Sequence, residues 1–99
     1  MAETQSDTIT KDEITYPNRY NVVFINDDFT PMDFVVQLLV EVFNITLEEA
    51  KDVTLQIHAK GKGIAGSYNY ELAEQKKAEA VAISRNNGHP LTILVEKIE

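Results

Sequence analysis

The side chains best suited to chemistry in this 99-residue chain are Asn26, Asp27, Asp28 and His58. Carboxylates and imidazole can bind a metal ion or act as acid and base in catalysis, so a metal-dependent hydrolase that uses Asp27, Asp28 and His58 is one interpretation. The same residues are also typical of a polar turn that satisfies nearby backbone donors, and of a histidine favoured by the dipole at a helix end. No recognised ligand spacing joins them, so the residues alone leave these interpretations open.

Other reactive patterns in the chain are incomplete. His89 stands between Gly88 and Pro90 and is predicted to be a turn residue. The Gly-Lys-Gly segment at 61–63 lacks the other elements of a phosphate-binding loop. The chain has no cysteine, which excludes disulfides and thiolate zinc sites. We therefore expect no cofactor, no bound metal and no enzymatic activity.

The charge of the chain limits its partners. Sixteen acidic residues against nine basic residues give a net charge of -7, which repels phosphate backbones and anionic lipids. No apolar run is long enough to span a bilayer, and the first residues carry acids where a targeting peptide is basic. We expect a cytoplasmic monomer that binds neither nucleic acid nor membrane.

Apolar periodicity predicts the elements on either side of the Asn-Asp-Asp segment. Five of the six residues at 20–25 are apolar, as in a strand covered on both faces. Residues 31–43 carry apolar side chains at helical spacing. Thr30 is predicted to be the N-cap of this helix, with Pro31 at its first position. The three polar residues then lie at a strand-to-helix junction, which is a common place for a functional loop.

The second half of the chain is predicted from its caps. Thr46 and Glu49 have the spacing of a capping box, and Gly61 is placed to end the same helix after about Lys60, so His58 lies in its last turn. The remaining segments are a strand over 64–68, a helix over 70–87 capped by Asn69, and a strand over 91–98.

The predicted element order is β-α-α-β-α-β. This is an α+β domain in which three helices pack on a three-stranded antiparallel sheet. We assign residues 18–99 to this core domain. Residues 1–17 hold too few large apolar side chains to repay the entropy of ordering, and they are predicted to form a flexible N-terminal tail.

Four motifs together resemble the ClpS family of Clp protease adaptors. They are NDDFTPMDFV at 26–35, QIHAKGKG at 56–63, the pair Glu71 and Lys76, and HPL ending at Leu91. The resemblance covers about residues 18–98. It implies the β-α-α-β-α-β fold already predicted, which is similar to the C-terminal domain of a ribosomal stalk protein.

The resemblance also implies a role for each candidate residue. It places Asn26, Asp28 and His58 around the α-amino group of a bound N-terminal residue, and Asp27 against the backbone of the residue that follows. An α-ammonium has three donors and no acceptor, so a carbonyl, a carboxylate and a neutral imidazole suit it. The implied pocket for the first side chain, with Met32 as its gatekeeper, is lined by Thr30, Met32, Val35, Thr54, Ile57 and Leu91.

The function implied is a non-enzymatic adaptor. It binds proteins with N-terminal Leu, Phe, Tyr or Trp and delivers them to a ClpA-type unfoldase for degradation. Glu71 and Lys76 match family positions that contact the N-terminal domain of that unfoldase, and the tail is needed for delivery. Thr54 departs from the commoner family pattern, which has methionine there. The alternative is a binding module of the same fold that recognises another peptide end or an internal motif.

Overall fold

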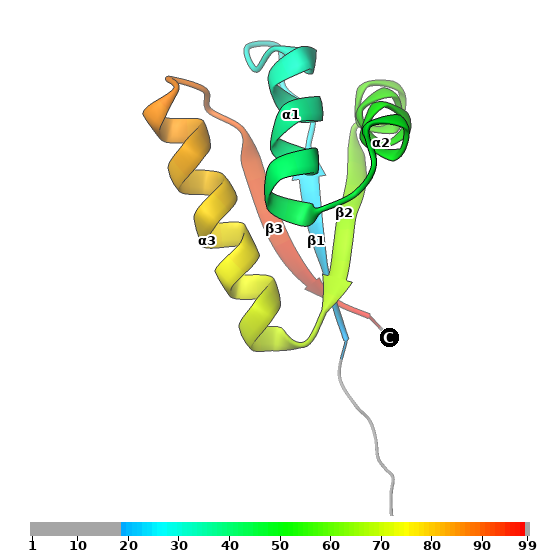
Figure 1. Ribbon diagram of the computed structural model, residues 1–99, viewed down its shortest axis with the longest axis vertical. Coiled ribbons are helices and arrows are strands. Elements are labelled where there is room, and N and C mark those ends of the chain that lie inside the picture. Colours follow the sequence, from blue (N-terminus) through cyan, green and yellow to red (C-terminus); the bar gives the residue numbers. More distant parts are fainter. Residues whose placement is uncertain (1–18, 99) are drawn as a thin grey trace, which may run out of the picture.

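The computed structural model describes residues 19–98, so the predicted tail at 1–17 lies outside the described residues. The six elements follow one another in the order β-α-α-β-α-β, which confirms the predicted fold (Figure 1). Their bounds are β1 Tyr20–Ile25, α1 Met32–Phe43, α2 Leu47–Lys60, β2 Lys62–Tyr68, α3 Tyr70–Asn86 and β3 Thr92–Lys97. The second strand begins two residues before its predicted start, and the other elements begin and end within about one residue of their predicted bounds.

The sheet has β1 at its centre and runs antiparallel on both sides, in the order β2-β1-β3. Val22 and Phe24 belong to the core cluster that β1 shares with the helices, and both are fully buried. Val23 points to the opposite face, where its register partners are Ile64 and Leu94. Val23 is only 2% exposed, so the prediction of a strand covered on both faces is confirmed at the centre of β1.

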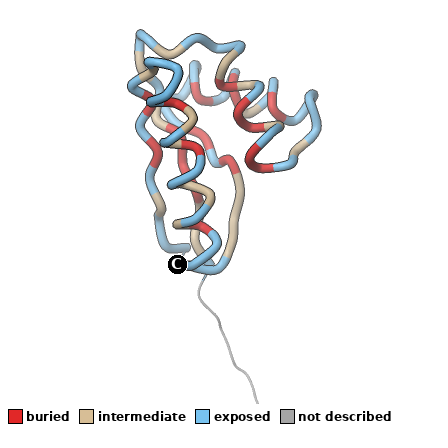
Figure 2. The backbone as a smooth tube through the Cα atoms, turned by 60° about the vertical axis from the view of Figure 1, so that its left-hand side comes forward, coloured by how far each residue is buried: buried red, intermediate tan, exposed pale blue. Residues whose placement is uncertain are grey.

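The first helix supplies more of the core than any other element. Its buried residues follow helical spacing along one face, and the ring of Phe43 meets Phe24 of β1 edge-on at 5.5 Å between centroids. These buried residues are Val35, Leu38, Leu39, Val42 and Phe43. The helix is apolar on more than this face, since Met32 is exposed and Val36 is half-buried. Figure 2 shows the red, buried turns of the helices gathered toward the sheet.

The predicted caps of α2 and α3 are confirmed. In α2, the Thr46 hydroxyl accepts from the Glu49 backbone N–H, and the Glu49 carboxylate accepts from the Thr46 N–H. Gly61 ends the helix in the left-handed conformation at φ 90°, which a residue with a side chain rarely adopts. Asn69 accepts from the backbone N–H of Leu72 and begins α3. The contacts of Thr46, Glu49 and Gly61 at the two ends of α2 fix the position of His58 in its last turn.

The prediction that Thr30 caps α1 is wrong. The N-cap position belongs to Pro31, and no side chain caps the helix there. The Thr30 hydroxyl instead donates to the carboxylate of Asp27, three residues earlier in the chain. No helix among residues 19–98 is long and apolar enough to cross a bilayer.

Candidate functional site

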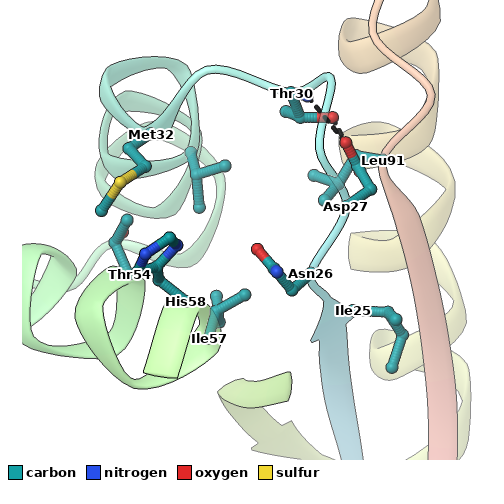
Figure 3. A pocket seen from close by; sticks show the side chains of 10 residues that line it. Ile25, Asn26, Asp27, Thr30, Met32, Thr54, Ile57, His58 and Leu91 are labelled. Carbon is teal, nitrogen blue, oxygen red and sulfur yellow. Dashed lines mark hydrogen bonds between the residues drawn. The ribbon is translucent and has the colours of Figure 1, made fainter. Parts of the chain in front are cut away.

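A small cavity of about 20 Å³ lies where the loop after β1 meets α1, the end of α2 and the residue before β3. Nine of the ten residues that line it were predicted as site residues, and the tenth is Ile25, the last residue of β1 (Figure 3). The ten are Ile25, Asn26, Asp27, Thr30, Met32, Val35, Thr54, Ile57, His58 and Leu91. The structure therefore brings together segments that are far apart in the sequence.

Asp27 holds the loop of this site in shape. One carboxylate oxygen accepts from the backbone N–H groups of Phe29 and Thr30, at 2.8 and 2.7 Å, and the other accepts from the Thr30 hydroxyl at 2.9 Å. Burial opposes ionisation of Asp27, but these hydrogen bonds and the nearby His89 outweigh burial and hold the pKa of Asp27 below its usual value. The ionised Asp27 thus organises the turn that leads into α1.

Asn26 and His58 stand at the opening of the cavity and come from different elements. Asn26 follows β1, and its backbone N–H donates to the carbonyl of Gly61 at 2.8 Å. Gly61 is the residue that ends α2, three residues after His58. Both side chains are exposed, and Figure 3 shows the side chain of Asn26 pointing toward His58. The backbone hydrogen bond fixes the spacing between the two halves of this opening.

Inside the opening, the wall is apolar and closely packed. Val35, Ile57 and Leu91 are at most 5% exposed, whereas Met32 is 42% exposed. Thr54 is also buried, and its hydroxyl donates to the carbonyl of Ala50 at 2.7 Å, so its polar group is already satisfied within α2. The wall can therefore accept an apolar group without leaving a polar atom unpaired.

Two residues that sequence reasoning missed support this wall from behind. A Cβ on Gly63 would lie 2.7 Å from Cγ1 of Ile57, so only glycine lets α2 approach β2 this closely. Arg85 donates through Nη1 to the carbonyls of His89 and Leu91, at 3.0 Å each. Gly63 could have been noticed as part of the Gly-Lys-Gly segment, but no local pattern in the sequence indicates the role of Arg85.

His89 lies in the turn between α3 and β3, as predicted, but it is more than a turn residue. Its ring packs against Phe34 of α1, with the centroids 4.4 Å apart, and its charge contributes to the lowered pKa of Asp27. The turn before β3 is thereby tied both to α1 and to the loop of the site.

Three predicted site residues lie outside the cavity lining. Asp28 is exposed on the loop beside Asp27, and Glu71 is exposed in the first turn of α3. Lys76 is half-buried, and its ammonium donates to the carbonyl of Val42 at 2.7 Å. Lys76 therefore satisfies a carbonyl in the last turn of α1, where a cation is also favoured by the helix dipole.

The described part of the chain holds no group of three or more His, Asp or Glu side chains arranged to bind a metal ion. Asp27, Asp28 and His58, the residues of the hydrolase interpretation, do not form such a group. What the site offers instead is an apolar recess with an amide, an imidazole and acidic side chains at its rim. Such a recess suits a ligand with a cationic head and an apolar body.

Comparisons with known proteins point to one family. The family model described as ATP-dependent Clp protease adaptor protein ClpS matches residues 15–94. Two relatives, both called ATP-dependent Clp protease adapter protein ClpS, come from Xanthomonas oryzae pv. oryzae (strain MAFF 311018) and Vibrio atlanticus. The first is 46% identical over 87 residues, which cover 88% of this chain and 82% of the relative. The second is 42% identical over 95 residues, which cover 94% of this chain and 90% of the relative.

A solved structure is similar as well. It is described as Agrobacterium tumefaciens ClpS2 bound to L-phenylalaninamide. The likeness has a TM-score of 0.80 and 30% sequence identity, and it covers 84% of this chain and 100% of that chain.

Proposed function

The chain belongs to the ClpS family of adaptors for the ATP-dependent Clp protease, and from this premise we propose that it captures proteins by their first residue. The proposed ligand is a free α-amino group together with a bulky apolar side chain, from Leu, Phe, Tyr or Trp. One observation carries the proposal: a single cavity combines an apolar interior with Asn26 and His58 at its opening. Such a cavity suits the two parts of an N-terminal residue.

The amine part of the proposal follows from hydrogen-bond chemistry. An α-ammonium has three N–H donors, which the carbonyl oxygen of Asn26 and an unprotonated nitrogen of His58 can accept. Asp28 stands outside the cavity lining, and its proposed role is to supply negative charge at the rim. Acetylation removes both the charge and two of the three donors. It therefore distinguishes recognition of a free N-terminus from recognition of an internal peptide segment.

Asp27 has a second proposed role besides holding the loop. Its carboxylate can accept about four hydrogen bonds, and three are already made to Phe29 and Thr30. The remaining capacity is enough for the backbone N–H of the second residue of a bound peptide. In this proposal one carboxylate both shapes the loop and marks where the peptide backbone continues.

The ligand of the similar structure supports the side-chain part of the proposal. L-phenylalaninamide, which that ClpS2 is described as binding, has a free α-amine, a benzyl group and an amide. The amide stands in for the peptide bond to a second residue. A protein that begins with Phe presents the same three groups, and Val35, Ile57 and Leu91 offer an apolar wall to such a ring.

Delivery to a ClpA-type unfoldase is the second half of the proposed function. Glu71 is exposed at the start of α3 and is free to meet the N-terminal domain of that partner. Lys76 has a structural contact to Val42, so only its remaining donors are proposed to face the unfoldase. The tail at 1–17 is proposed to act in delivery and to have no part in capture.

The test is a titration with peptides that differ only in the first residue. Binding of Leu, Phe, Tyr and Trp peptides, with none for Gly or for acetylated Leu, is the expected result. Equal binding of acetylated and free peptides would favour a module of the same fold for an internal motif. Peptide cleavage that stops on addition of a chelator would favour the metal-dependent hydrolase.

A further inference from the structure

A second and larger cavity shares two wall residues with the candidate site. It is a groove of about 230 Å³ between α1 and α2, and Met32 and Thr54 line both cavities. The other residues along the groove are Asp33, Val36, Lys51 and Leu55. Met32 and Thr54 therefore form the wall that separates the small cavity of the candidate site from the larger groove.

The small cavity has too little space for the proposed ligand. About 20 Å³ is room for about one water molecule, and an isobutyl group or an indole ring is larger than that. A wall must therefore move when a bulky first residue enters. Val35, Thr54 and Leu91 are at most 5% exposed, and packed interiors resist such shifts.

Met32 is the wall residue that can move. It is the first residue of α1, its side chain is 42% exposed, and an unbranched thioether has several low-energy conformers. The groove beyond it offers apolar contacts in place of water. Val36 lies one turn further along α1, and Leu55, which follows Thr54 on α2, is 58% exposed.

We infer that Leu55 and Val36 determine specificity without lining the pocket. The groove receives the side chain of Met32 when the first residue of a peptide is large, and the free space beside Leu55 sets how far Met32 can retreat. This inference rests on the proposed function, and it predicts which first residues of a peptide are preferred. N-terminal Trp needs the largest movement and depends most on the groove, whereas Leu depends on it least.

The matched experiment uses two exposed leucines of the same helix. Leu55→Phe fills the groove, and Leu47→Phe places the same ring at the first residue of α2, where the side chain is 54% exposed and lines neither cavity. We expect Leu55→Phe to weaken binding of a Trp peptide by about tenfold, the lower end of what a methyl-sized loss of space costs in a pocket. Binding of a Leu peptide should change several times less. Leu47→Phe should change neither.

Two results would overturn the inference, and they differ from a failure of the proposed function. If both peptides bind the unchanged protein but Leu55→Phe leaves the ratio of their affinities unchanged, Leu55 is not a determinant and the proposed function stands. If neither peptide binds the unchanged protein, the proposed function fails and the inference fails with it. Thermal unfolding of each variant shows whether a lost affinity reflects a lost fold.

A direct measurement follows Met32 itself. The chain has only two methionines, Met1 and Met32, so selective methyl labelling gives at most two signals in an NMR spectrum. On addition of the Trp peptide, the Met32 methyl should gain contacts to the methyl groups of Leu55 and Val36. If it keeps its contacts to the pocket wall instead, the groove does not receive it and the inference is wrong.

Discussion

Replacement of Thr54 by methionine should narrow the range of first residues that the protein accepts. Thr54 is 4% exposed, lines the cavity and directs its hydroxyl to the carbonyl of Ala50, which leaves its methyl group as the surface for a ligand. In the proposed complex, its place one turn before His58 would put that methyl group against the Cβ region of the bound side chain. Ile and Val are branched at Cβ, so a longer side chain at this position would crowd them most.

The magnitude follows from the size of the change. The cavity of about 20 Å³ has no spare room for the added length of methionine, so the added bulk competes with the ligand. A methyl-sized difference in a pocket is worth about 1 to 3 kcal/mol, or roughly 10- to 200-fold in affinity. We therefore expect the unchanged protein to bind Ile and Val peptides measurably, and Thr54→Met to lose at least about tenfold in its affinity for Ile relative to Leu.

The assay is fluorescence anisotropy with Leu, Ile and Val peptides of otherwise identical sequence. Thr54→Val is the matched control, because it keeps the branched shape and replaces the hydroxyl, which donates to the carbonyl of Ala50, with a methyl group. The control should lose stability but keep the preference between Leu and Ile. If the unchanged protein and Thr54→Met show the same ratio of affinities for the Leu and Ile peptides, Thr54 does not determine specificity.

Four further predictions concern the amine, the loop, the partner surface and the tail. Acetylation of a Leu peptide should abolish binding in the same titration, and retained affinity would remove the amine from the recognition. Asp27→Ala should lower the free energy of unfolding by about 1 kcal/mol at neutral pH, as loss of a side-chain cap does. Because the folded-state pKa of Asp27 is lowered, this difference should shrink as acid protonates Asp27 in the unchanged protein, which denaturant titrations at several pH values would detect. Glu71→Lys should spare peptide affinity and thermal stability while weakening the complex with a ClpA-type unfoldase, whereas Lys76→Glu should also lower the unfolding temperature because Lys76 contacts α1. Deletion of residues 1–16 should preserve peptide affinity but stop degradation of a Leu-initiated reporter, and delivery at full rate would contradict the role of the tail.

The features that the sequence predicted correctly depend on contacts within a few residues. The capping box of Thr46 and Glu49 spans a single turn, and Gly61 ends α2 through its own backbone conformation. The apolar run of β1 and the helical spacing in α1 likewise indicate which side chains are buried. Caps and apolar patterns of this kind can be predicted from the sequence without knowledge of the tertiary contacts.

The features that the sequence did not predict depend on choices between competing partners or on distant contacts. Thr30 looked like a helix cap, but the carboxylate of Asp27 lies within reach and binds its hydroxyl, so α1 begins without a side-chain cap. The contact of Lys76 with a carbonyl 34 positions earlier in the chain was not predicted either, because no local pattern announces it. Arg85 acts on Leu91 only because the chain turns back between α3 and β3.

The site has a rigid rim and a wall that can move. The rim would meet the amine, which is the same in every proposed ligand, and the wall would meet the side chain, which differs between ligands. The backbone N–H of Asn26 is bonded to Gly61 at the end of α2, and Asp27 makes three hydrogen bonds within its own loop, so the rim that would meet the amine has little freedom. Every N-terminal residue presents the same amine, and a fixed rim serves them all. The side chain differs from one protein to the next, and the wall that would meet it includes the exposed, unbranched Met32. Selectivity should therefore change readily at Met32 and its neighbours, whereas the requirement for a free amine should survive every substitution that keeps Asn26 and His58 and leaves the loop and the end of α2 in place.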